Sequence, residues 1–290
     1  MTDDSRPRVC LTFDFDALSI WLRMFDTPTA SGIARGEFDA RIGTPRILDL
    51  LAREEVPGTF FTPGHTVETF PDVCRRIVAD GHELAHHGHF HLDTCGLDEQ
   101  GARTELEQGF EAIDRVLGVR PRGYRAPGGD LSLDMIALLV EYGFDYDSSL
   151  MAQDLLPYYP RVGDLPHRER PFEFGTEVDL VELPCLVSLI DVPQMEFLMR
   201  PPVPGLHANR KILEMWCEEL DWMCDRNPGA VFTLVLHPST IPRGARFAVL
   251  EGLIRHAKER DAVFVTSADA AAEWRRRHPF PVVGSDGRPG

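Results

Sequence analysis

Two short segments of this chain carry side chains that could hold a metal ion beside a catalytic carboxylate. Asp14 and Asp16 stand two residues apart near the N-terminus, and His87 and His91 stand four apart further along. A catalytic zinc site uses three protein ligands and keeps a position for water, whereas a structural zinc site uses four protein ligands. Asp16, His87 and His91 could therefore bind one divalent metal ion, with Zn²⁺ the expected one. Asp14 could then act on the water as a base.

The spacing of the two aspartates supports this interpretation. In an extended segment, residues two apart point to the same face, so Asp14 and Asp16 share one face and Phe13 and Phe15 the other. Two carboxylates this close repel each other unless a cation lies between them or one is protonated. Because charged groups are seldom buried without a partner, the apolar surroundings favour a metal site over an ordinary acidic loop.

The segment from Gly81 to Gly88 contains a competing pattern. His82, Glu83 and His86 match the His-Glu-x-x-His motif of zinc proteases, which needs a helix to bring both histidines onto one face. The glycines at both ends leave no room for such a helix. We therefore interpret His82, His86 and His89 as packing or supporting residues.

Two further residues could take part in the chemistry. Arg125 follows a predicted strand, where an arginine can fix a carboxylate through paired hydrogen bonds and lower its pKa. It could equally be one surface arginine among many. His237 follows the apolar run 231–236 and could act as a general acid or be a core histidine.

The elements that must position these residues alternate along the chain. We predict strands at 8–15, 58–62, 82–85, 144–148, 178–183, 231–236 and 263–265, with another ending at 124–127. We predict helices at 44–55, 68–80, 97–117, 133–142, 208–226, 247–260 and 268–277. Alternating strands and helices imply an α/β fold with a parallel sheet, and their number favours a (β/α) barrel. No Gly-x-Gly-x-x-Gly follows the first strand, which weakens a dinucleotide-binding alternative.

We expect one domain, a catalytic barrel over residues 1–278, with a flexible C-terminal tail at 279–290. Two proline-rich stretches, 155–171 and 191–205, are predicted to be long loops. Loops of this kind often shape the pocket of a barrel.

The composition limits the classes of partner that this protein could bind. A net charge of −16 over 290 residues argues against binding to nucleic acid or to an anionic membrane. The chain shows neither a long apolar span nor a secretory leader, so we expect a cytoplasmic protein. The six cysteines form no Cys-x-x-Cys pair and are predicted to be free.

Four motifs, taken in order, resemble the polysaccharide deacetylase superfamily of metal-dependent amide hydrolases. They are Thr-Phe-Asp-x-Asp at 12–16, His-x-x-x-His at 87–91, Arg-x-Pro at 125–127 and Leu-His-Pro at 236–238. The resemblance implies a distorted, TIM-barrel-like (β/α) barrel with about seven parallel strands. It also implies site residues with the following roles: Asp14 as base, Asp16, His87 and His91 as metal ligands, Arg125 as the residue that orients the base, and His237 as general acid. An acidic residue assists the general acid in that family, and Asp191 is the nearest counterpart.

Some features depart from the commoner pattern of the superfamily. Phe15 separates the two aspartates, Ala17 follows them, and Leu92 rather than proline follows His91. Together with other segments, these features are similar to a small-molecule branch of cyclic imide hydrolases and allantoinase-like enzymes. The segments are Gly36–Arg41, Gly43–Arg46 and Thr59–Pro71. Members of that branch are often homo-oligomers, so the resemblance implies a dimer or tetramer.

We therefore expect a hydrolase of non-peptide carbon–nitrogen bonds. A cytoplasmic enzyme is separated from cell-wall polymers, which favours a small cyclic imide or amide as substrate. The alternative is N-deacetylation of a polysaccharide or amino sugar. Two other classes stay open: a non-haem iron oxygenase, since two histidines and a carboxylate also describe its metal site, and a catalytically silent binding protein.

Overall fold

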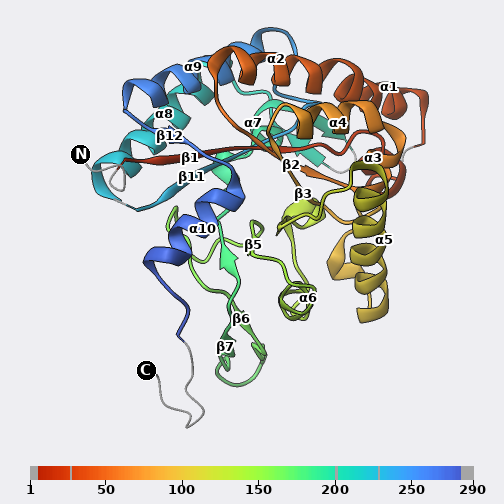
Figure 1. Cartoon of the computed structure of the whole chain (residues 1–290), viewed down its shortest axis with the longest axis vertical. Coiled ribbons are helices and arrows are strands. Elements are labelled where there is room, and N and C mark those ends of the chain that lie inside the picture. The colour runs from red at the N-terminus through yellow and green to blue at the C-terminus, as the bar shows by residue number, and fades with distance from the viewer. Residues whose placement is uncertain (1–5, 27, 200–201, 228, 282–290) are drawn as a thin grey trace.

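The fold is built around one curled parallel β-sheet (Figure 1). The computed structural model describes residues 6–26, 28–199, 202–227 and 229–281. The strands lie in the order β11 (Val231–Leu236), β1 (Arg8–Asp14), β2 (Thr59–Thr62), β3 (Glu83–His86), β4 (Gly123–Tyr124), β5 (Tyr146–Asp147) and β8 (Val181–Glu182). A further strand, β12 (Val263–Phe264), pairs with the start of β1. The predicted α/β fold is confirmed.

The sheet curls into a distorted barrel. The chain that leaves β8, at one end of the strand order, reaches β11 at the other end, where Ile190 forms a parallel bridge with Val235. Every residue of β1 and β11 is buried, as expected for parallel strands that are covered on both faces. This curvature brings the carboxyl ends of the strands toward one another.

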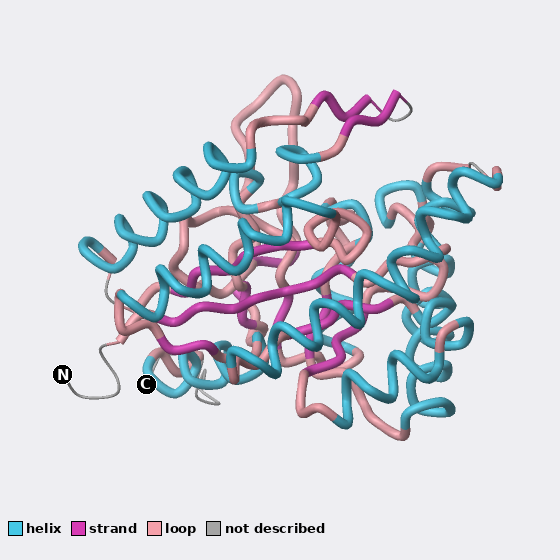
Figure 2. Tube along the Cα trace, turned by 90° about the horizontal axis from the view of Figure 1, so that it is seen from above, coloured by secondary structure: helices cyan, strands magenta, loops and turns pink. Residues whose placement is uncertain are grey.

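Helices cover the outside of the sheet, and the strands lie in the interior (Figure 2). The helices are α1 (Ala30–Phe38), α2 (Thr44–Glu54), α3 (Gly64–Thr69), α4 (Pro71–Ala79), α5 (Glu99–Leu117), α6 (Met135–Glu141), α7 (Asp191–Met195), α8 (Asn209–Arg226), α9 (Phe247–Glu259) and α10 (Ser267–Arg277). The longest, α5, begins where the Asp98 side chain accepts a hydrogen bond from the Gly101 N–H. It ends at Gly118, which is in the left-handed conformation.

Several predicted elements differ from the structure. The single helix expected at 68–80 is two helices, α3 and α4, because Pro71 starts a new helix after Phe70 takes a non-helical conformation, with φ −127° and ψ 56°. The stretch 191–205 is not a plain loop. It forms α7 and then a hairpin of β9 (Phe197–Met199) and β10 (Pro202–Pro204).

Other parts of the chain carry structure that the sequence patterns did not predict. The stretch 155–171 contains β6 (Arg161–Val162), which pairs with β7 (Thr176–Glu177). Residues 20–24 and 30–43 are helical, with π-helical turns η2 (Ile20–Met24) and η3 (Asp39–Gly43) on either side of α1. Most of the expected tail, 282–290, lies outside the described residues. Among the helices that are described, none is both long and apolar enough to cross a membrane.

Candidate active site

The site begins at the carboxyl end of β1. Asp14 and Asp16 both line one pocket, whereas Phe13 and Phe15 are fully buried in the main hydrophobic core. The predicted alternation of faces is therefore confirmed. The chain turns sharply after Asp16, since Ala17 has a φ of 48°. Asp39, a buried residue that the sequence did not point to, accepts a hydrogen bond from the Ala17 N–H at 3.0 Å and holds this turn.

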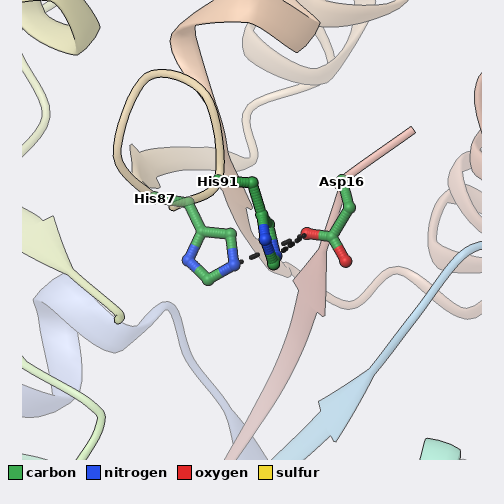
Figure 3. Close-up of side chains that lie close together, drawn as sticks. All are labelled: Asp16, His87 and His91. Atoms are coloured by element: carbon green, nitrogen blue, oxygen red, sulfur yellow. Dashed lines mark ion pairs between the residues drawn. The ribbon is translucent and has the colours of Figure 1, made fainter. Parts of the chain in front are cut away.

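Asp16, His87 and His91 converge as predicted for metal ligands (Figure 3). Asp16 Oδ1 lies 3.5 Å from His87 Nε2 and 3.3 Å from His91 Nε2, and all three side chains are buried. Ligand atoms about 2.0–2.1 Å from a tetrahedrally coordinated ion are about 3.3 Å apart, which matches these separations. Asp16 Oδ1 also has no hydrogen-bond donor although it is buried. The three residues therefore fit a divalent metal ion.

The surrounding backbone orients the two histidines. His87 Nδ1 donates to the Arg125 carbonyl at 2.7 Å, which leaves Nε2 directed at Asp16. His91 has a φ of 58°, in the left-handed region that few residues with a side chain adopt. Strain of this kind is retained where a side chain must be aimed at a site.

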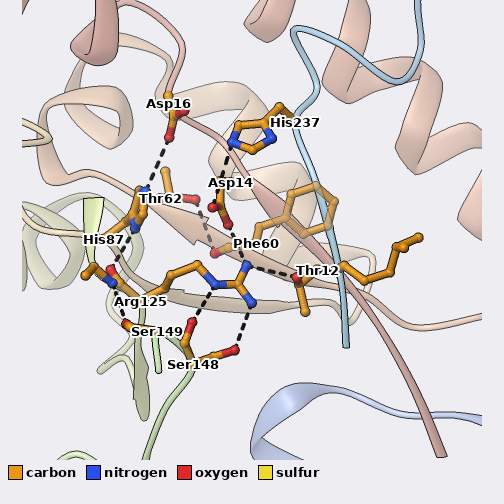
Figure 4. A network of polar contacts seen from close by, with 12 residues as sticks. Thr12, Asp14, Asp16, Phe60, Thr62, His87, Arg125, Ser148, Ser149 and His237 are labelled. Atoms are coloured by element: carbon orange, nitrogen blue, oxygen red, sulfur yellow. Dashed lines mark hydrogen bonds and ion pairs between the residues drawn. The ribbon is translucent and has the colours of Figure 1, made fainter. Parts of the chain in front are cut away.

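Arg125 binds Asp14, as the sequence predicted (Figure 4). Its Nη1 donates to Asp14 Oδ1 at 2.6 Å and to the Thr12 hydroxyl at 2.9 Å. Nε donates to the Ser148 carbonyl and Nη2 to its hydroxyl, both at 2.9 Å, and the guanidinium stacks on Phe61. Burial would lower the pKa of Arg125, but Asp14 and smaller contributions from Cys185 and Tyr146 together raise it. Arg125 therefore stays charged and its position is tightly defined.

His237 faces Asp14 across the pocket and is bound to Asp191. His237 Nδ1 lies 2.7 Å from Asp191 Oδ1, and the His237 N–H donates to Asp191 Oδ2 at 2.9 Å. Burial alone would lower the pKa of His237, but the carboxylates of Asp191 and Asp14 raise it to about 10. The imidazole therefore holds a proton at neutral pH, before any metal ion adds its own positive charge.

The remaining histidines of the Gly81–His91 segment lie in other places. Glu83–His86 is strand β3, not a helix, so the protease pattern has no structural basis. His86 is fully buried with its pKa lowered to about 3 by burial, and Nε2 contacts the Leu106 carbonyl. His82 Nδ1 accepts a hydrogen bond from the Gly58 N–H. Their predicted supporting roles agree with these contacts.

The pocket in front of these residues has a volume of about 430 Å³. One wall is apolar and comes from η2 and the turn after it, with Ile20, Trp21, Met24 and Phe25. The sequence patterns did not single out this segment, although its short run of large apolar residues directly after Asp16 was a usable signal. A second wall carries arginines from α1 and from the loop after β11. The segment 191–205 lines the pocket too, as expected for a pocket-shaping stretch.

Comparison with known proteins defines the class of this protein. The sequence profile described as polysaccharide deacetylase matches residues 2–146. The peptidoglycan deacetylase of Helicobacter pylori is 34% identical over 281 residues, which cover 92% of this chain and 95% of that protein. The chain therefore belongs to the polysaccharide deacetylase family, and it is a hydrolase of that family with an Asp-His-His triad suited to a metal ion.

Solved structures share the fold. The crystal structure of a candidate polysaccharide deacetylase from Mycobacterium smegmatis has a TM-score of 0.83 at 33% identity, covering 100% of this chain and 96% of that one. The crystal structure of the Puue allantoinase has a TM-score of 0.78 at 23% identity, covering 97% of this chain and 94% of that one. At that identity the second likeness concerns the fold alone. Membership of this hydrolase family disfavours the oxygenase alternative.

Proposed function

We propose that the chain removes N-acetyl groups from the amino sugars of a glycan. One observation carries this proposal. Asp14 and His237 face the same pocket beside the metal triad, and each is held by its own buried partner, Arg125 or Asp191. A carboxylate on one side and a protonated imidazole on the other are the groups that can serve as base and acid in amide hydrolysis.

Asp14 is the proposed base. Its Oδ1 is occupied by Arg125, so Oδ2 is the oxygen left to accept a proton from the attacking water. The bond to Arg125 fixes the orientation of the carboxylate, so that Oδ2 lies on the side of His237. A divalent ion on Asp16, His87 and His91 would lower the pKa of a bound water and polarise the amide carbonyl.

His237 is the proposed acid. Its Nδ1 is bound to Asp191, so Nε2 is the atom that can deliver a proton to the departing nitrogen. Without that proton an amine is a poor leaving group and the carbon–nitrogen bond does not break readily. A metal ion nearby would move the raised pKa of His237 back toward neutrality, which makes the imidazolium a stronger acid.

The expected small cyclic imide has less support than the glycan alternative. The peptidoglycan deacetylase of H. pylori is similar to this chain over most of its length, whereas the allantoinase shares only the fold. The expectation of a cyclic imide rests on a cytoplasmic location and on segments similar to the small-molecule branch, and both are predictions from the sequence. The aromatic wall at Trp21 and Phe25 also suits the apolar face of a sugar ring.

The test is a substrate comparison with the purified, zinc-loaded protein. The substrates are N-acetylglucosamine oligomers, peptidoglycan fragments, succinimide, hydantoin and allantoin, and the products are acetate or the ring-opened amide. We expect acetate from the sugars, and acetate release at least about a hundredfold slower from a matched Asp14→Asn variant. Ring opening of an imide without acetate release from any sugar would overturn the proposal.

A further inference from the structure

The pocket has an excess of positive charge on the wall away from the metal triad. Arg35, Arg243 and Arg246 line this wall, and Glu196 is the one carboxylate among the described lining residues outside the catalytic pair and the metal ligands. Arg125, the fourth arginine of the pocket, is already bound to Asp14. Three guanidinium groups thus face a single carboxylate.

Two of these arginines share Glu196. Arg246 donates to Glu196 Oε1 and, at 2.6 Å, to the Met195 carbonyl. Arg35 Nη1 lies 3.9 Å from Glu196 Oε2, and its guanidinium lies over the Trp21 ring. These two contacts use both oxygens of Glu196.

Arg243 has no carboxylate partner among the described residues. Its Nε donates to the Ser239 carbonyl at 2.6 Å, and its guanidinium stacks 3.6 Å from the centre of the Phe38 ring. Both contacts fix the group in place, and the two Nη nitrogens have no hydrogen-bond acceptor in the described part of the chain. Burial and the nearby charges of Arg35 and Arg246 lower the pKa of Arg243, although Glu196 and the buried Asp39 oppose this shift. An anion placed here would relieve the repulsion between the guanidinium groups.

This local charge is opposite in sign to that of the whole protein. The chain has a net charge of −16, yet this wall is positive. Arginine pairs with carboxylates through two parallel hydrogen bonds, which makes a fixed guanidinium a selective site for that group.

We propose that the substrate carries a carboxylate close to its N-acetyl group, and that Arg243, supported by Arg35, binds that carboxylate. The inference rests on the proposed deacetylation and adds the chemical class of the sugar: an acidic N-acetylhexosamine unit rather than a neutral one. Arg243 and His237 belong to the same loop after β11, tied by the hydrogen bond to Ser239. A carboxylate held by Arg243 therefore positions the amide nitrogen relative to the acid.

The experiment compares substrates that differ in one charge. N-Acetylmuramic acid carries the carboxylate on the acetylated sugar itself, and its methyl ester is the neutral match. A disaccharide of N-acetylglucosamine and glucuronic acid carries the carboxylate on the neighbouring sugar, with chitobiose as the neutral match. With zinc-loaded protein we expect kcat/KM to be about ten- to a hundredfold higher for the acidic member of at least one pair, as for a charged hydrogen bond gained. The pair in which the acidic member reacts faster shows whether the carboxylate belongs to the acetylated sugar or to its neighbour.

Arg243→Gln should remove most of this preference, mainly by raising KM for the acidic substrate. Arg75→Gln, on the exposed surface of α4, is the matched control and should leave the preference unchanged. Calorimetric binding of N-acetylmuramic acid and its ester to Asp14→Asn gives a readout that needs no turnover. If sugars are deacetylated but acid and neutral partners react and bind equally, this inference is wrong and the proposed function stands. If no sugar is deacetylated, the proposed function itself fails.

Discussion

His237 Nε2 lies 3.9 Å from Asp14 Oδ2. This separation is too long for a direct hydrogen bond and leaves the two groups free to act on a reacting group between them. Each is held from behind, Asp14 by Arg125 and His237 by Asp191, so neither can turn away from the pocket. This arrangement suits Asp14 as the base and His237 as the acid.

Replacement of Asp14 by Asn should abolish most hydrolysis while metal binding persists. The amide keeps the size of the side chain but cannot accept a proton from water. We expect a loss of about 10²- to 10⁴-fold in kcat, the usual contribution of a general base. Metal content measured by mass spectrometry should equal that of the unchanged protein. Normal turnover by this variant would show that another group is the base.

Replacement of His87 or His91 by Gln should remove the metal ion and, with it, activity. Both histidines direct Nε2 at the otherwise unpartnered Asp16 Oδ1. His82→Gln is the control, because His82 belongs to the protease pattern but lies away from the triad. We expect metal content near zero in the first two variants and unchanged in the third. Metal loss in the His82 variant alone would reverse our assignment of ligands within this segment.

Replacement of Asp191 by Asn should shift the pH dependence of kcat. Asp191 is the main group that raises the pKa of His237, so its loss lowers that pKa. A general acid works only while protonated, and the fall of kcat at alkaline pH should therefore begin at a lower pH in the variant. A role for Asp191 in packing alone would reduce kcat equally at every pH. Initial rates between pH 6 and 10 separate the two outcomes.

The buried pair Asp147 and Glu182 should make the free energy of unfolding depend on pH. Asp147 and Glu182 are paired residues on the neighbouring strands β5 and β8. Burial raises the pKa of Asp147 to about 6, and burial and the nearby Asp147 raise that of Glu182 well above its usual value. Glu182 Oε1 accepts hydrogen bonds from the N–H groups of Ser149 and Leu150. Asp147 directly precedes Ser148, whose carbonyl and hydroxyl accept hydrogen bonds from Arg125.

The direction in which the free energy of unfolding changes with pH follows from proton linkage. Unfolded carboxyl groups release their protons near pH 4, whereas the folded pair keeps a proton to higher pH. The stabilisation is therefore full below about pH 4 and is lost as pH rises through the folded pKa values.

Glu182→Gln keeps the hydrogen bonds from Ser149 and Leu150 and removes one titrating group. Relative to the unchanged protein, this variant should gain on the order of 1–3 kcal/mol between pH 4 and pH 8 in urea unfolding. A constant difference between the two proteins across this range would contradict the shared proton.

Much of the fold and the metal site could be predicted because their signals are local. Strands β1 and β11 are continuous apolar runs, and the predicted ranges differ from the observed ones by a single residue or none. The two-residue period of a strand placed Asp14 and Asp16 on one face without knowledge of any neighbour. Errors arose where short elements depend on their surroundings, as at Pro71 and in the α7–β9–β10 stretch.

The sequence by itself determined the residue types of the chemistry and their places at the ends of strands, because backbone periodicity is set by neighbours along the chain. Only the tertiary structure decided which side chains meet. Asp191 lies 46 residues before His237, in a stretch predicted to be a loop, and Arg243 stacks on Phe38 from the other end of the chain. Such pairings leave no periodic trace, since they depend on how the sheet curls and brings distant loops to one pocket.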